Sequence, residues 1–334
     1  MIITRSSFHK LVFASATVLT VPNQGQNYGP AAQYVRDAVT LIIREKDPTL
    51  AGSILRLAFH DAAVRSVASN PNIGGPDGSI RYELDWSENR GLKRPLDVVN
   101  GIYQDQKEFC ASNVIASGSS AIFDDKKCDE LSFADVLALS GAAAVEAAEG
   151  PRIMIKLGRT DVTNANQKYL DKPILSESER SDIRTSLPSA GLDSLGLRNF
   201  FVQRIGLSEA EMVALMGAHD LGRHVTLTDM SKSCLKNLTR TCLEEAPVLA
   251  PFITANPDSM SNSYYKSLLR WNDRVMEYGE AAFIPTDVAM VVDDSLKNYV
   301  VAFANNESLF FRTFVDAYKK LVETHEMTLT SRRY

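Results

Sequence analysis

The chain has 334 residues, 45% of them hydrophobic, and a formal net charge of −5 at pH 7. A soluble chain of this length can bury a large core in one or two domains. It has no basic cluster, whereas nucleic-acid binding requires a dense array of Lys and Arg. No apolar run reaches the roughly 20 residues that span a bilayer. We therefore expect small neutral or weakly charged partners, no nucleic acid and no transmembrane span.

Residues 1–27 differ in kind from the rest of the chain. Arg5 and Lys10 precede an apolar run from Leu11 to Val21, and a polar stretch follows it. This outline is typical of a targeting segment, for which we expect a chloroplast or secretory destination. A tail of the folded domain is the alternative, because no Ala-x-Ala cleavage site follows the run.

Helical periodicity dominates from there on, and no sustained alternation of apolar and polar residues indicates a large sheet. The pattern predicts a mainly α protein. Two of the helices open with a capping box, Ser132-Phe-Ala-Asp135 and Ser208-Glu-Ala-Glu211. Residues 164–189 are predicted to connect two halves, and residues 225–251 are predicted to be an insertion. The expected helices run from Tyr34 to Lys46, from Pro48 through His60, from Ser132 to Ala148, from Ser208 toward His219 and from Asn305 to Val322.

The four cysteines, Cys110, Cys128, Cys234 and Cys242, include no Cys-x-x-Cys pair. That spacing argues against a zinc ribbon or a thioredoxin-like site. Two disulfides, one in each half of the chain, are one interpretation. Reduced buried cysteines are the other, because a chain of this size folds without disulfides.

Two histidines carry the chemical argument. Arg56 and His60 are four residues apart in an apolar helix, so their side chains reach over the same small volume. A fixed cation beside a proton acceptor suits the breaking of a polar bond such as O–O. The second histidine, His219, lies far downstream and near a predicted helix end.

These segments and several others resemble the plant, fungal and bacterial haem peroxidase superfamily, over about residues 28–325. The resemblance rests on eight motifs in the superfamily's order. They are Leu55-Arg-Leu-Ala-Phe-His-Asp61, Gly74-Gly-Pro-Asp-Gly-Ser-Ile80, Asn89-Arg-Gly-Leu92, Ser132-Phe-Ala-Asp135, Leu157-Gly-Arg-Thr-Asp161, Gly217-Ala-His219, Asn262-Ser-Tyr-Tyr265 and Pro285-Thr-Asp287.

The resemblance implies a mainly α, two-lobed fold with haem b between the lobes. Residues 28–160 would form the distal lobe and residues 161–325 the proximal lobe, followed by a tail, 326–334. The implied activity is the reduction of hydrogen peroxide by electrons from a small organic donor, through a ferryl intermediate. The cofactor would be haem b, with Ca²⁺ as a further candidate.

The resemblance also assigns roles to particular residues. His60 would be the distal base, Arg56 would stabilise the charge that develops on peroxide, and Asn89 would accept the second N–H of His60. His219 would be the iron ligand. Asp287 would accept its second N–H, although Thr-Asp after proline is also a common helix start, so a helix cap is the alternative for Asp287.

A calcium site is a further implication. Asp61, Gly75, Asp77 and Ser79 match the distal calcium ligands of the lignin-type and secretory peroxidases, and oxygen ligands suit calcium. A turn closed by a capping aspartate is the alternative.

With its departures from the superfamily pattern, the chain resembles a divergent relative of ascorbate peroxidase that has distal features of the lignin-type and secretory peroxidases. Phe59 and Phe252 occupy the distal and proximal positions where ascorbate and cytochrome c peroxidases carry tryptophan. Ser261 replaces an aspartate of the proximal cation site, and Asp220 follows His219 where Ser or Thr is usual. We therefore expect no conventional proximal cation. Thr228 falls where ascorbate peroxidases have an ascorbate-binding arginine.

Two other functions stay open. One is a catalytically weak peroxidase-fold protein that acts as a binding or structural partner, for example in a plastid. The other is a haem sensor or carrier, which would not need Arg56. Retention of both sides of the haem chemistry favours the enzyme.

Overall fold

A computed structural model describes residues 28–64, 75–116, 128–162, 187–188, 191–226, 248–251, 256–271 and 283–323. Within these ranges the protein is mainly helical, as the periodicity predicts, with one pair of short strands. The expectations for residues 1–27, for the tail 326–334, for Phe252 and for Cys234 and Cys242 concern residues outside these ranges.

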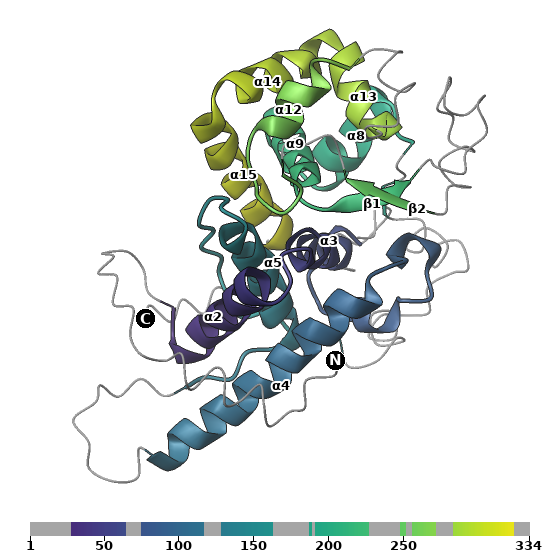
Figure 1. The fold of residues 1–334 in the computed structure, drawn as a ribbon. Coiled ribbons are helices and arrows are strands. Elements are labelled where there is room, and N and C mark those ends of the chain that lie inside the picture. Colours follow the sequence, from purple (N-terminus) through teal and green to yellow (C-terminus); the bar gives the residue numbers. More distant parts are fainter. Residues whose placement is uncertain are drawn as a thin grey trace, which may run out of the picture.

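In the first half of the chain, three helices pack around a fourth, α5 (Figure 1). They are α2 (Pro30–Glu45), α3 (Leu50–Ala63), α4 (Lys93–Ala116) and α5 (Phe133–Ala147), with the 3-10 turns η1 (Ser79–Tyr82) and η2 (Ser87–Asn89) between α3 and α4. Almost every residue of α5 is buried, because this helix contacts α2, α3 and α4. Its alanines let those neighbours approach closely.

The second half forms another group of helices (Figure 1). It comprises α8 (Ser194–Leu197), the π-helical η3 (Arg198–Arg204), α9 (Glu209–Met216), the 3-10 turn η4 (Gly217–Asp220), α12 (Ser263–Leu268), α13 (Pro285–Val292), α14 (Asp294–Asn305) and α15 (Glu307–Val322). Strands β1 (Arg223–Thr226) and β2 (Val248–Pro251) pair antiparallel. These strands lie at the two ends of the expected insertion, most of which falls outside the described residues.

The two groups meet where α3 passes the turn that follows η4. A Cβ atom on Gly52 of α3 would lie 2.8 Å from the Cα atom of Gly222 and 2.8 Å from the carbonyl oxygen of Leu221. Gly222 itself has a φ of 98°, a conformation that favours glycine. Two glycines thus allow backbone to contact backbone at this junction. A second contact is the stacking of Phe59 of α3 on Phe201 of η3.

The start of α5 is held by two aspartates. Ser132 Oγ accepts a hydrogen bond from the Asp135 backbone N–H at 3.0 Å, as a capping box requires. The other half of the predicted box is wrong, because the Asp135 carboxylate accepts from the backbone N–H groups of Gly158 and Arg159 instead. Asp161 also caps the helix, at other donors, and accepts from the first two N–H groups of α5 at 2.9 and 2.8 Å.

Arg159 extends this contact to the end of α15. Its side chain is buried, and Nη1 donates to Asp135 Oδ1 at 2.7 Å. Nε and Nη2 both donate to the carbonyl oxygen of Val322, at 3.1 and 2.7 Å. The Leu157-Gly-Arg-Thr-Asp161 motif is therefore a structural connection between α5 and α15.

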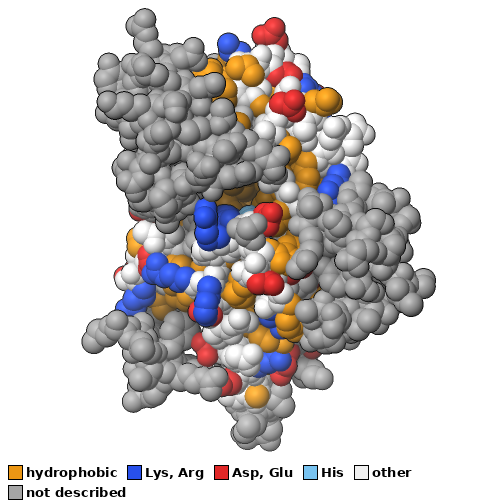
Figure 2. Space-filling model, turned by 90° about the vertical axis from the view of Figure 1, so that its right-hand side faces the viewer, with side chains coloured by type: hydrophobic (Ala, Val, Ile, Leu, Met, Phe, Trp, Pro, Cys, Tyr) orange, Lys and Arg blue, Asp and Glu red, His pale blue; other side chains and the backbone are white. Residues whose placement is uncertain are grey.

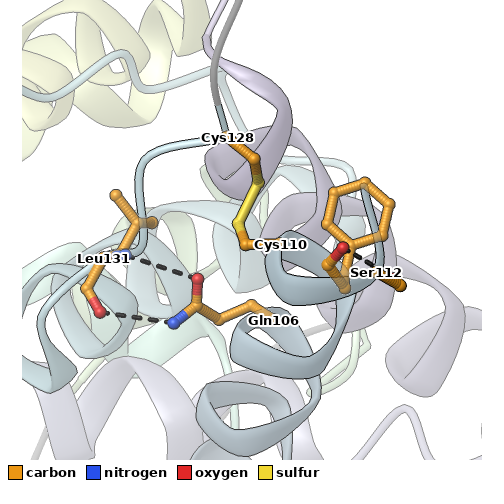
Figure 3. Close-up of a disulfide and its surroundings, with 6 residues drawn as sticks. Gln106, Cys110, Ser112, Cys128 and Leu131 are labelled. Carbon is orange, nitrogen blue, oxygen red and sulfur yellow. Dashed lines mark hydrogen bonds between the residues drawn. A yellow bond between two sulfur atoms is a disulfide. The ribbon is translucent and has the colours of Figure 1, made fainter. Parts of the chain in front are cut away.

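A disulfide joins Cys110 of α4 to Cys128, which confirms a disulfide in the first half of the chain (Figure 3). One turn earlier, the buried Gln106 side chain both donates to and accepts from the backbone of Leu131, each bond at 3.3 Å. The disulfide and this amide pair together attach α4 to the segment that precedes α5.

The surface carries charges of both signs among hydrophobic side chains, as one face of the molecule shows (Figure 2). No helix among the described residues is both long enough and apolar enough to cross a membrane.

Candidate active site

The loop that ends in η2 fixes the tautomer of His60. His60 Nδ1 lies 2.7 Å from Asn89 Oδ1, and Asn89 Nδ2 donates to the backbone carbonyl of Glu83 at 2.7 Å. Because the amide nitrogen of Asn89 points at a carbonyl oxygen, the amide oxygen must be the atom that faces His60. His60 Nδ1 therefore carries the proton, and Nε2 keeps the lone pair of a base.

His60 is neutral as well as oriented. Burial lowers the pKa of its imidazole to about 3; the positive charge of Arg56 acts in the same direction, and the hydrogen bond to Asn89 opposes both. The ring therefore stays unprotonated at Nε2 throughout the neutral pH range.

Arg56 is held by the same loop. Its Nη1 donates to the Arg90 carbonyl at 3.1 Å and its Nη2 to the Glu88 carbonyl at 2.6 Å, on either side of Asn89. These bonds use two of the five N–H groups that a guanidinium offers. The Arg56 side chain keeps solvent-exposed surface. The protein atoms around its guanidinium partly desolvate it, and this desolvation together with the charge of Arg90 lowers the pKa of Arg56 to about 10. Arg56 is thus a fixed cation at neutral pH.

His219, in η4, pairs with a fully buried carboxylate. His219 Nδ1 lies 2.8 Å from Asp287 Oδ1, and Asp287 Oδ2 accepts from the Ile284 backbone N–H at 3.0 Å. Because a carboxylate only accepts, Nδ1 of His219 carries the proton and Nε2 carries the lone pair of the ring. Both interpretations of Asp287 apply, since one oxygen caps the start of α13 and the other orients His219.

The predicted capping box Ser208-Glu-Ala-Glu211 is confirmed at the start of α9, the helix that leads to His219. The following Gly217 has a packing reason. A Cβ atom at this position would lie 2.5 Å from Phe310 Cε2 and 2.5 Å from the Tyr265 hydroxyl oxygen. Only glycine lets the chain turn into η4 under these two rings.

Asp220, directly after His219, organises the start of α12. Its fully buried carboxylate accepts from the Ser261 backbone N–H at 2.5 Å, from Ser263 Oγ at 2.7 Å and from the Tyr264 backbone N–H at 2.9 Å. Burial raises the pKa of Asp220, and these donors act against that rise. The departures at Asp220 and Ser261 therefore meet in one contact, in which the carboxylate accepts from the backbone N–H and the hydroxyl group of Ser261.

Tyr264 is the residue to which the sequence assigned no role, although it lies in the Asn262-Ser-Tyr-Tyr265 motif. Its hydroxyl donates to Asp287 Oδ1 at 2.5 Å, the same oxygen that faces His219. Burial and the nearby carboxylate raise the pKa of the Tyr264 phenol well above its usual value, so the hydroxyl stays a donor.

The candidate calcium residues form a compact turn. Asp61 Oδ2 accepts from the Gly78 backbone N–H at 3.0 Å and Oδ1 from the Ile80 backbone N–H at 3.1 Å, while Asp77 Oδ1 accepts from the Ser79 backbone N–H at 3.0 Å. Asp61 thus caps the loop through both oxygens. Over the described ranges, no group of three or more His, Cys, Asp or Glu side chains is arranged to hold a metal ion.

Phe59 and Phe252 are the remaining candidate residues of the haem pocket. Phe59 is half-buried and makes an edge contact with the ring of His60, at 5.8 Å between centroids. Phe252 lies outside the described residues. The structure therefore brings Arg56, His60 and Asn89 into one cluster and His219, Asp287 and Tyr264 into another.

The mainly α fold is that of the haem peroxidases. The sequence matches the peroxidase family over residues 35–123 and 119–306, and the chain belongs to that family. Within it, the chain is a divergent relative of the ascorbate peroxidases.

Three ascorbate peroxidases illustrate this relationship. The chain is 32% identical to "L-ascorbate peroxidase T, chloroplastic" of Arabidopsis thaliana over 80% of this chain and 54% of that protein. It is 29% identical to "L-ascorbate peroxidase 3" of the same plant over 87% of this chain and 82% of that protein. It is 30% identical to "Probable L-ascorbate peroxidase 4, peroxisomal" of Oryza sativa subsp. japonica over 81% of this chain and 72% of that protein.

Proposed function

We propose that the protein binds one b-type haem through His219 and reduces hydrogen peroxide with electrons from a small organic donor. The carrying observation is the matched pair of histidines, each of which donates from Nδ1 to a fixed acceptor and therefore has its lone pair on Nε2. The acceptors differ in charge. The neutral amide of Asn89 leaves His60 a base, whereas the carboxylate of Asp287 makes His219 more anionic, which suits an iron ligand.

The donor set fits a haem group. The His219 side chain keeps 26% of its surface exposed, so part of the imidazole is accessible despite its buried partner. Phe59 is half-buried and offers an apolar surface beside His60. When bound, haem supplies a redox-active iron, which is the chemistry that these side chains lack.

Arg56, His60 and Asn89 would then act on hydrogen peroxide. With haem bound and supplying the electrons for O–O cleavage, Nε2 of His60 would take a proton from one oxygen of hydrogen peroxide and return it to the other, which leaves as water. Arg56 stabilises the negative charge that develops on the departing oxygen. Asn89 keeps His60 in the basic tautomer throughout. General base catalysis and charge stabilisation each contribute about 10²-fold or more to such reactions.

The test is haem binding by the purified protein and by His219→Ala. We expect one haem per wild-type chain, with a Soret band that is lost or grossly altered in His219→Ala. His224→Ala is the control, because it removes a histidine five residues later to which we assign no role. An unchanged spectrum in His219→Ala would remove His219 as the ligand.

The catalytically weak binding or structural protein is the second candidate, and a haem sensor or carrier is the third. Neither explains why one loop holds both Arg56 and His60 in place, so the described contacts favour the enzyme.

The proposal also includes the lobe boundaries, the reaction intermediate, a calcium ion and the location of the protein. The lobe boundaries, 28–160 and 161–325, follow the resemblance. The ferryl intermediate, a calcium ion at Asp61, Gly75, Asp77 and Ser79, and a plastid or secretory location stay predictions. For calcium, Asp61 already accepts from the backbone N–H groups of Gly78 and Ile80.

A further inference from the structure

Tyr264 contacts both members of the proximal pair. It is fully buried in α12, and its hydroxyl donates to Asp287 Oδ1 at 2.5 Å. Its ring meets the ring of His219 edge to face, at 6.0 Å between centroids and 87° between planes. Asp287 Oδ1 therefore accepts from two donors, the His219 imidazole and the Tyr264 phenol.

The backbone of Tyr264 is fixed as well. Its N–H donates to Oδ1 of Asp220, the residue that follows His219, at 2.9 Å. The same carboxylate holds Ser261 and Ser263 on the approach to α12. Tyr264 is thus bonded through its backbone to Asp220 and through its hydroxyl to Asp287, the hydrogen-bond partner of His219. These two bonds leave the phenol little freedom to move away.

We propose that Tyr264 is a positioning residue that limits how strongly Asp287 draws the proton of His219, and so sets the electron density that His219 gives to a bound iron. This inference rests on the proposed function. A second donor on Oδ1 disperses the negative charge of that oxygen, so the oxygen accepts less strongly from His219. The imidazole then stays less anionic than it would with Asp287 alone, and the Fe(III)/Fe(II) reduction potential is more positive.

Packing alone is the competing explanation, and the next residue provides the control. Tyr265 is also fully buried in α12, but its hydroxyl donates to the carbonyl oxygens of Val213 and Ala214 in α9, at 2.8 and 3.1 Å. Tyr265→Phe removes a phenol hydroxyl from the same helix without touching Asp287. Tyr264→Phe removes the donor to Asp287 and keeps the ring.

The experiment compares the haem-loaded wild type, Tyr264→Phe and Tyr265→Phe by redox titration followed in the visible spectrum. We expect a more negative potential in Tyr264→Phe and an unchanged potential in Tyr265→Phe. Resonance Raman spectra of the reduced proteins give an independent measure, in which a more anionic His219 raises the iron–histidine stretching frequency in Tyr264→Phe alone.

The outcomes separate this inference from the proposed function. Haem content is determined from the Soret band before the titration. A haem-loaded Tyr264→Phe with the wild-type potential and stretching frequency would overturn the inference and leave the proposed function intact. Equal shifts in both variants would also overturn it, because packing would then be the cause. A wild-type chain that takes up no haem would overturn the proposed function, and the inference with it.

Discussion

At the scale of single residues, the low pKa of His60 predicts an unusual pH profile for the reaction with peroxide. An unperturbed histidine titrates near pH 6.5, whereas burial lowers the pKa of His60 to about 3. The basic form of His60 is lost only when the pH falls to the pKa that this imidazole has in the folded protein. We therefore expect a rate constant that is flat from pH 7 to about pH 5 and falls on further acidification, as measured by stopped-flow absorbance of the haem-loaded protein.

Substitution of His60 tests its role in the same stopped-flow measurement. His60→Ala should lower this rate constant about 10²-fold or more and remove its dependence on His60 titration. The same pKa shift affects folding stability. The His60 side chain binds a proton near pH 6.5 in the unfolded chain but not in the folded one, so it lowers the free energy of unfolding as the pH falls from 6.5 toward 3. A wild-type rate that already falls between pH 7 and pH 6 would show that His60 titrates near its ordinary value.

The residue pairs differ in how far the sequence could predict them. The resemblance to the haem peroxidases predicts the contacts of His60 with Asn89 and of His219 with Asp287, because each of these residues lies in a motif whose role the superfamily defines. Tyr264 also lies in a motif, but its bond to Asp287 depends on how α12 packs against α13. That packing depends on Asp220, whose four hydrogen-bond donors lie 41 to 44 positions further along the chain.

At the scale of elements, Arg159 joins the start of α5 to the end of α15. Arg159→Met would leave the buried Asp135 carboxylate without its cation and the Val322 carbonyl without two donors. Removal of one partner of a buried ion pair costs about 3–5 kcal/mol. We expect a loss of this size in the free energy of unfolding, measured in urea. Arg312→Met, at an exposed position of α15, is the control and should change little.

Helix positions were easier to predict than helix caps. The expected helix Tyr34–Lys46 is observed as Pro30–Glu45, and the expected helix Asn305–Val322 as Glu307–Val322. Apolar periodicity is local, so it survives folding. The cap of α5 is different, because Asp135 lies in the right place for a capping box but Arg159, 24 residues later, binds its carboxylate. A tertiary ion pair displaced the local hydrogen bond to the Ser132 backbone N–H, and Asp161 caps the next two N–H groups, those of Phe133 and Ala134.

At the scale of the whole molecule, the mainly α fold followed from the pattern, but the strand pair did not. β1 and β2 are four residues each and frame a long insertion, so neither shows a sustained alternation. The contact between the two helical groups was equally out of reach. It depends on Gly52 and Gly222 meeting backbone to backbone, and an isolated glycine in a helical pattern does not indicate its partner.

That junction gives the last prediction. Gly52→Ala puts a Cβ atom 2.8 Å from the Gly222 backbone, so α3 must move away from the turn after His219. Overpacking of this kind costs about 1–3 kcal/mol, and it also displaces the helix that carries His60 from the segment that carries His219. We expect a lower unfolding midpoint together with faster haem loss. Gly101→Ala in α4 is the control: a Cβ atom there meets nothing within 4 Å, so the helix should gain about 0.5–1 kcal/mol from the better helix former. Equal midpoints for the two variants would contradict a close junction at Gly52, because both changes add the same methyl group to a helix.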